Sequence, residues 1–143
     1  MDTNVFLYAV EHHPTYGKPC EGILRDIESG QLDAICSRLV LVEFVHVLVR
    51  LNQKLEEQRR EEFNVPELTD ALLALVPNWA ELDDAIVKRA SHYTVRVNPP
   101  DYFHIATMEI HGVTQVLSAD RELDKVAHVK RMDPRDYRGL PKA

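Results

Sequence analysis

The sequence predicts an α/β fold in which helices cover a central, mostly parallel sheet. Short apolar segments typical of strands alternate along the chain with longer segments of helical periodicity, which is the pattern of parallel α/β domains. The chain has 143 residues, of which 45% are hydrophobic and 28% charged, a composition that supports a packed core. Because no repeat, low-complexity tract or glycine–serine linker interrupts it, we expect residues 1–143 to form one domain.

The individual elements are predicted from apolar spacing and from end signals. Helices are expected where apolar residues recur at helical spacing or where a proline or aspartate marks a helix start, and Gly30 and Gly112 mark the ends of two of them. Strands are expected where short apolar or alternating segments lie between these helices. The expected helices are 16–29, 66–75, 83–92 and 101–111, with a helical turn from Asp120, and the expected strands are 32–36, 78–82, 113–118 and 129–132.

Two segments are ambiguous from their residues alone. Leu39–Leu51 contains five valines, which favour a strand. Its 13 nearly continuous apolar residues exceed the ~4–8 of a buried strand, so length favours a buried helix. The polar residues 53–62 that follow are expected to be a solvated extension or loop, and Ser37 is placed to cap the helix. Val5–Val10 could itself be a strand.

The composition excludes several classes of protein. No apolar stretch approaches the ~18–20 residues needed to cross a bilayer, and no signal sequence is recognisable, so we expect no membrane association. Cys20 and Cys36 are too few for a disulfide framework or a self-contained zinc site, which suits a reducing cytoplasm. The net charge of −6 argues against binding nucleic acid by bulk positive charge.

The charge is unevenly distributed along the chain. Residues 121–143 carry seven basic and four acidic side chains, a local charge of +3, so the preceding part carries −9. This basic segment is either a solvated tail or a contact for phosphate groups.

Glu43 is the most informative acidic residue. Within residues 39–49 it is the only charged side chain, and His46 is the only other polar one. A carboxylate on an apolar helix loses solvation free energy unless a cation, a metal or a hydrogen-bond donor meets it. Glu43 is therefore either functional or at the polar edge of the helix, paired with Arg38 or Arg50.

Three further acids lie near expected junctions or the chain terminus. Functional side chains of α/β proteins gather where strands end and helices begin. Asp101 follows two prolines at a helix start, and Asp120 follows the strand that ends near Ser118. Each of these two could instead cap its helix and stabilise the helix dipole. Asp2 is uninformative by itself.

Taken together, these acids suggest a metal site. Carboxylates that converge from distant parts of a chain repel one another unless cations lie between them, and hard oxygen ligands select Mg²⁺ or Mn²⁺. Such a metal supports phosphodiester cleavage by neutralising a phosphoryl oxygen and providing a water nucleophile. It also removes the objection raised by the acidic net charge, because the metal presents positive charge to the substrate.

Other constellations are weaker. The five glycines are scattered and form no phosphate-binding loop, and no His-Glu-x-x-His motif is present. His104 and His111 share a helix face but lie seven residues apart, too far for one metal, so we expect packing or surface roles. The serines and cysteines have no convincing triad neighbours, which argues against covalent catalysis.

Four segments resemble the motifs of one known family and occur in that family's order. They read DTNVFL from Asp2, SRLVLVEF from Ser37, DYFHIATM from Asp101 and VLSADREL from Val116. The family is the PIN-domain nucleases, and the chain looks most like the VapC-type toxins of prokaryotic toxin–antitoxin pairs. The resemblance spans residues 2 to about 134.

The resemblance implies a Rossmann-like α/β/α sandwich that hydrolyses RNA with Mg²⁺ or Mn²⁺. It also implies a homodimer and an antitoxin whose tail enters the acidic groove. Asn4 and Ser118 match polar positions that orient the site. Asp124, one helical turn after Asp120, is either an auxiliary ligand or a surface acid. The matching metal ligands, which would also be the catalytic residues, are Asp2, Glu43, Asp101 and Asp120.

The chain departs from the family pattern at two positions. Leu123 stands where the family often has phenylalanine, a conservative packing change. Only Met1 precedes Asp2 in this sequence, whereas the family has an apolar run there that forms a central strand. The resemblance accordingly makes Val5–Val10 the start of a helix. We favour a start codon assigned too late over a missing strand, without which Asp2 would be poorly held.

Two other functions stay open at this point. The missing strand and the acidic surface would also suit a non-catalytic PIN-like interaction module. A Rossmann-like phosphatase or receiver domain would need an aspartate nucleophile and a partner lysine, and no suitable lysine lies near Asp2 or Asp101 in the sequence.

Overall fold

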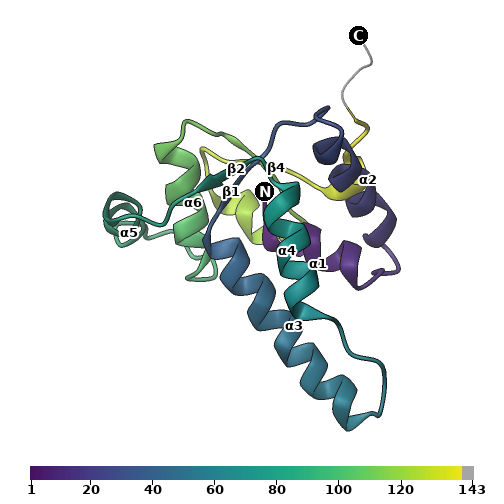
Figure 1. Ribbon diagram of the computed structural model, residues 1–143. Coiled ribbons are helices and arrows are strands. Elements are labelled where there is room, and N and C mark those ends of the chain that lie inside the picture. Colours follow the sequence, from purple (N-terminus) through teal and green to yellow (C-terminus); the bar gives the residue numbers. More distant parts are fainter. Residues whose placement is uncertain (140–143) are drawn as a thin grey trace.

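The structure is a computed structural model that describes residues 1–139 (Figure 1). Helices and strands alternate along the chain, as the sequence predicts. The helices are α1 (Thr3–Val10), α2 (Gly17–Glu28), α3 (Leu39–Glu57), α4 (Val65–Leu75), α5 (Asp84–Ala90) and α6 (Asp101–Ile110). The strands are β1 (Ile35–Ser37), β2 (Asn78–Ala80), β3 (Gln115–Leu117) and β4 (Lys130–Met132), and two 3-10 turns, η1 (Arg121–Lys125) and η2 (Pro134–Asp136), complete the fold.

The strands are parallel, as expected, but they form two separate pairs. β1 pairs with β2, with Cys36 opposite Trp79, and β3 pairs with β4, with Val116 opposite Arg131. Each strand has three residues, fewer than the ~5–6 of a typical strand. The expected parallel sheet is therefore present in two halves.

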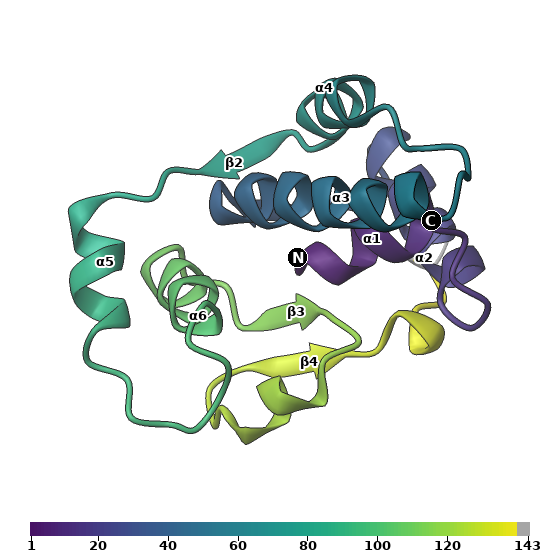
Figure 2. The same ribbon diagram turned by 90° about the horizontal axis from the view of Figure 1, so that it is seen from below.

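Met1 and Asp2 lie between these halves. The α-amino group of Met1 donates a hydrogen bond to the Ile35 carbonyl oxygen at 2.9 Å, and the Asp2 N–H donates to the Leu117 carbonyl oxygen at 3.1 Å. The two residues thus pair with both halves, as a strand between them would. A groove of about 530 Å³, lined by residues of β1 and β3, opens beside Met1. The N-terminus lies close to the middle of the molecule in both views (Figures 1 and 2).

The strands are shorter than expected, in the first case because a turn occupies the start of the predicted range. The strand predicted over 32–36 begins at Ile35. The Leu32 N–H bonds to the Asp26 carbonyl oxygen at 2.9 Å, and the Asp33 carboxylate accepts from Asn78, so these residues close the turn after α2. The other predicted strands are likewise shortened to three residues, whereas the four predicted helices are found within two residues of their expected ends.

Both ambiguous segments are helical. α3 runs past the apolar segment into residues 53–62 and ends at Glu57, and it buries Val40, Phe44 and Leu48 at intervals of four residues. Val5–Val10 belongs to α1, in agreement with the family resemblance rather than with the strand alternative. Length and helical periodicity therefore outweigh the β-propensity of the valines.

Four hydrophobic clusters of the described residues position the helices, including one that packs α2 against α1 and one that packs α5 against α6. The two largest pack α1, α3, α4 and β1 around Phe6 and Phe44, and α6, β3 and η1 around Ile105 and Leu123. α5 lies against α6 at one end of the molecule (Figure 2). Both cysteines are buried free thiols. Within residues 1–139, no helix combines the length and apolarity that a bilayer crossing requires.

Candidate active site

The four predicted acids lie close together although they come from four different segments. Asp2 is the N-terminal cap of α1, Glu43 is in the second turn of α3, Asp101 is the first residue of α6, and Asp120 immediately precedes η1. The negative charges of the other three all raise the pKa of Asp101. The four acids therefore converge in the fold, as the resemblance of their motifs to one family implies.

Asp101 is buried, with 9% of its surface exposed. Its Oδ2 atom has no hydrogen-bond partner among the described residues. The N-cap of α6 is Pro100, so Asp101 does not cap the helix, although it lies in the first turn, where an acid stabilises the helix dipole. Burial first, and then the charge of Asp2, raise the pKa of Asp101 to about 7. A buried carboxylate with a free oxygen is costly without a cation, so Asp101 fits a metal ligand.

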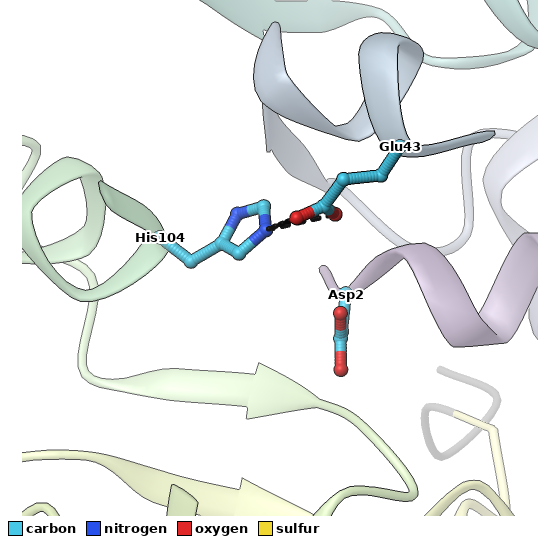
Figure 3. A group of neighbouring side chains, drawn as sticks. All are labelled: Asp2, Glu43 and His104. Atoms are coloured by element: carbon cyan, nitrogen blue, oxygen red, sulfur yellow. Dashed lines mark hydrogen bonds and ion pairs between the residues drawn. The ribbon is translucent and has the colours of Figure 1, made fainter. Parts of the chain in front are cut away.

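Glu43 faces His104 across the site (Figure 3). The Nε2 atom of His104 lies 3.2 and 3.1 Å from the two carboxylate oxygens of Glu43, and the Thr3 hydroxyl donates to Glu43 Oε2. Burial by itself would raise the pKa of Glu43, but the hydrogen bonds from His104 and Thr3 outweigh it, so the pKa is lowered. Burial would lower the pKa of His104, but its interactions with Glu43 raise it overall.

These contacts correct two interpretations of the sequence. His104 is not merely a packing or surface residue, because 12% of its side chain is exposed and its ring faces a carboxylate. Arg38 does not pair with Glu43 but forms a 3.0 Å ion pair with Glu81. The spacing of three residues between Asp101 and His104 places both on one face of α6, and that signal could have identified His104.

Asp2 is held by two polar side chains. Asn4 Nδ2 donates to Asp2 Oδ2 at 2.6 Å and to Ser118 Oγ at 3.1 Å, and the Ser118 hydroxyl donates to the same Asp2 oxygen. The roles expected for Asn4 and Ser118 therefore have a geometric basis. Asp2 is well held without a central strand, contrary to the expectation, because its side chain and its backbone N–H both reach the β3 segment.

Asp120 lies beside Asp101 and a further acid that the sequence analysis did not single out. One ligand oxygen each from Asp101, Asp120 and Glu122 lie within 4.8 Å of one another. Asp120 Oδ1 also accepts the Glu122 N–H at 2.8 Å, so its capping role is real. Glu122 accepts from Lys125 Nζ at 3.1 Å. The signal for Glu122 was its position two residues after Asp120.

Asp124 is bound by an arginine rather than by the acidic cluster. Arg131 Nε and Nη2 donate to its two oxygens at 2.9 and 3.1 Å. Arg135 similarly binds Asp133. Several cations of the basic segment are thus paired with acids of the same segment, and Lys142 lies outside the described residues. Because its carboxylate is bound by Arg131, Asp124 is supported as a surface acid rather than as an auxiliary metal ligand.

The residues present fit a divalent metal ion. One ligand atom each from Asp2, Glu43 and His104 lie within 4.8 Å of one another, next to the Asp101 group. Asp2, Asp101 and His104 also line a cavity of about 30 Å³ whose other walls are mainly apolar side chains such as Ile105 and Val116. Its volume is space for a single small ion or water. Oxygen-rich donor sets of this kind suit Mg²⁺ and Mn²⁺.

Sequence comparison relates the chain to known proteins. The chain is 25% identical over 135 residues to VapC ribonuclease Mb1869c of Mycobacterium bovis and, equally, to ribonuclease VapC13 of Mycobacterium tuberculosis. Each alignment covers 92% of this chain and 97% of the relative. The PIN domain family model matches residues 1–129. The chain therefore belongs to the PIN domain family.

Proposed function

We propose that this protein is a Mg²⁺- or Mn²⁺-dependent endoribonuclease and the toxin of a toxin–antitoxin pair. Its PIN-family membership and its similarity to two VapC ribonucleases support this activity. The single observation that carries the proposal is the buried Asp101, whose Oδ2 atom lacks a hydrogen-bond partner among the described residues and which lines a small cavity together with Asp2. Such a carboxylate needs a cation, and a cation in an acidic cluster binds phosphate.

Each residue of the site has a defined task in this proposal. When bound, a divalent cation supplies positive charge for the scissile phosphate and activates water for attack. Asn4 and Ser118 fix the orientation of the Asp2 carboxylate, and Thr3 fixes that of Glu43. The residues that would hold the metal and carry catalysis are Asp2, Glu43, Asp101 and Asp120.

We also propose the partners that this function requires. The substrate is RNA, and an antitoxin protein inhibits the enzyme by placing its tail in the acidic groove. The protein acts as a homodimer in the cytoplasm, where buried free thiols such as Cys20 and Cys36 stay reduced. Light scattering of the purified protein tests the dimer, and co-purification with the product of a neighbouring small gene tests the antitoxin.

RNA cleavage tests the central activity. We expect purified protein to cleave single-stranded RNA with Mn²⁺ or Mg²⁺ and to lose that activity in EDTA. Asp101→Asn should abolish cleavage without unfolding the protein, whereas Asp70→Asn, which changes an exposed acid on α4, should leave it unchanged. Cleavage that survives EDTA or Asp101→Asn would contradict the proposal.

The alternative is a non-catalytic PIN-like interaction module, and the division of the sheet into two halves favours it. Metal titration separates the two functions. An active nuclease should bind Mn²⁺ saturably and gain thermal stability from it. Absence of both effects would instead support the interaction module.

A further inference from the structure

His104 introduces a nitrogen donor into a site otherwise built from oxygen ligands. It projects from α6, one turn after Asp101, and its Nε2 atom lies 3.1 Å from Glu43 Oε2 (Figure 3). A ring nitrogen of His104 lies within 4.8 Å of one carboxylate oxygen each of Asp2 and Glu43, and these two oxygens are equally close to each other. The imidazole is therefore within the span of a single ion.

Two independent observations indicate that a ligand belongs beside this group. Asp101 Oδ2 is buried and has no hydrogen-bond partner among residues 1–139. The cavity of about 30 Å³ is lined by Asp2, Asp101 and His104 together. The imidazole and the partnerless carboxylate therefore border the same small space, which is large enough for one ion.

A nitrogen ligand changes which metal the site prefers. Mg²⁺ favours oxygen ligands and retains several waters. Imidazole favours first-row transition ions, for which affinity rises from Mn²⁺ towards Cu²⁺. One imidazole among carboxylates thus biases a site against Mg²⁺ without removing its affinity for Mn²⁺.

We propose that His104 is a direct metal ligand, which makes this a mixed nitrogen–oxygen site selective for Mn²⁺ and later first-row divalent ions over Mg²⁺. The inference rests on the proposed metal-dependent function. On metal binding, Nε2 exchanges its hydrogen bond to Glu43 for the ion, so Glu43 and His104 bind the same metal. The imidazole proton then resides on Nδ1 or is released to solvent.

Pulsed electron paramagnetic resonance of the protein with one equivalent of Mn²⁺ tests this directly, because a coordinated imidazole gives nitrogen-14 modulation. We expect the modulation in the unmodified protein and its loss in His104→Gln, whose amide can still donate a hydrogen bond to Glu43. His111→Gln, at the exposed C-cap of the same helix, is the matched control and should retain it. By calorimetry, His104→Gln should weaken Mn²⁺ binding by about tenfold and Mg²⁺ binding far less.

The outcomes separate this inference from the proposed function. Saturable Mn²⁺ binding without nitrogen-14 modulation would overturn the role of His104 and leave a metal-dependent nuclease intact. Modulation that persists in His104→Gln would also overturn it. Failure of Mn²⁺ to bind at all would overturn both. Because the unmodified protein alone can show the absence of nitrogen coupling, the test does not depend on whether His104→Gln folds.

Discussion

The Ser118 hydroxyl donates a hydrogen bond to the Asp2 carboxylate, and Asn4 bonds to both residues. This triangle connects the start of α1 to the end of β3. The backbone bond from Asp2 to Leu117 lies directly beside it. The position of the first predicted ligand is thus determined by residues near the far end of the chain.

Replacing Asn4 should loosen this triangle. Asn4→Ala removes the donor to Asp2 and the acceptor for the Ala119 N–H. We expect Mn²⁺ affinity to fall about tenfold and the free energy of unfolding to fall by about 1–2 kcal/mol. Calorimetry and urea unfolding measure the two effects, with the exposed Gln53→Ala as control. Unchanged Mn²⁺ affinity would show that Asn4 does not position Asp2.

The groove between β1 and β3 predicts a second effect. Adding about five β-branched apolar residues before Met1 should place a strand there, since Met1 and Asp2 already pair with Ile35 and Leu117. The new strand would bury apolar surface and complete hydrogen bonds on both sides. We expect the melting temperature to rise by about 5–10 °C, measured by thermal unfolding.

A glycine–serine extension of equal length is the control for this experiment. It has the same number of backbone groups but little apolar surface to bury, so it should leave the melting temperature nearly unchanged. Equal effects of the two extensions would mean that the groove does not accept an apolar strand.

Asp101 opposes the stability of the metal-free protein. Its pKa is raised to about 7, chiefly by burial and then by the charge of Asp2, so folding favours its protonated form. Its contribution to stability is therefore present below the unfolded pKa of about 4 and is lost as the pH rises through 7. In EDTA at pH 8, we expect Asp101→Asn to be more stable by about 1–2 kcal/mol, with a smaller difference at pH 5.

Added Mn²⁺ should reverse this order. The unmodified protein should gain thermal stability from the metal, whereas Asp101→Asn should gain little, because it lacks the ligand oxygen. Asp70→Asn should behave like the unmodified protein under both conditions. If metal-free Asp101→Asn were less stable than the unmodified protein at pH 8, the ionised Asp101 carboxylate would not be destabilising the metal-free fold.

Asp133 should have the opposite effect on stability. It is 6% exposed and accepts hydrogen bonds from Arg135 Nε and Nη2, each at 2.9 Å, and Arg131 lies 3.5 Å away. The bonds from Arg135 hold the pKa of Asp133 well below its usual range. The resulting stability is present above a pH of about 4 and is lost as the pH falls through the lowered pKa.

We therefore expect Asp133→Asn to lower the free energy of unfolding at pH 7 by about 1–2 kcal/mol, allowing for the partial exposure of Arg135. The difference should shrink between pH 4 and pH 2. Urea unfolding at several pH values measures it, and the exposed neighbour Asp136 provides the control Asp136→Asn. A deficit that does not change with pH would exclude the charge interaction as its cause.

Much of this architecture was predictable because the signals are local. Helices α2, α4, α5 and α6 have local apolar spacing or start signals, so their ranges are predicted within two residues. Helix α3 instead runs six residues beyond its apolar segment. Glu43 stands out because it is the only charge in an apolar segment. The strand limits were less predictable, since the turn formed by Leu32 and Asp33 depends on partners elsewhere in the chain.

The missed site residues depend on tertiary contacts. His104 gains its partner only when α6 lies opposite α3, and nothing near it in the sequence identifies Glu43 as that partner. The expectation that Asp2 would be poorly held was wrong for the same reason. Its hydrogen-bond partners, Ser118 and Leu117, are distant from it in the sequence. Long-range pairs of this kind cannot be deduced from periodicity or propensity.

The separation of Asp2 and Ser118 by 116 positions also affects biosynthesis. During synthesis, Ser118, which orients Asp2, and Asp120, which completes the acidic cluster, are made more than a hundred positions after Asp2. Contacts of such long range form late in folding. A growing polypeptide therefore has no assembled site until Ser118 and Asp120 have been added.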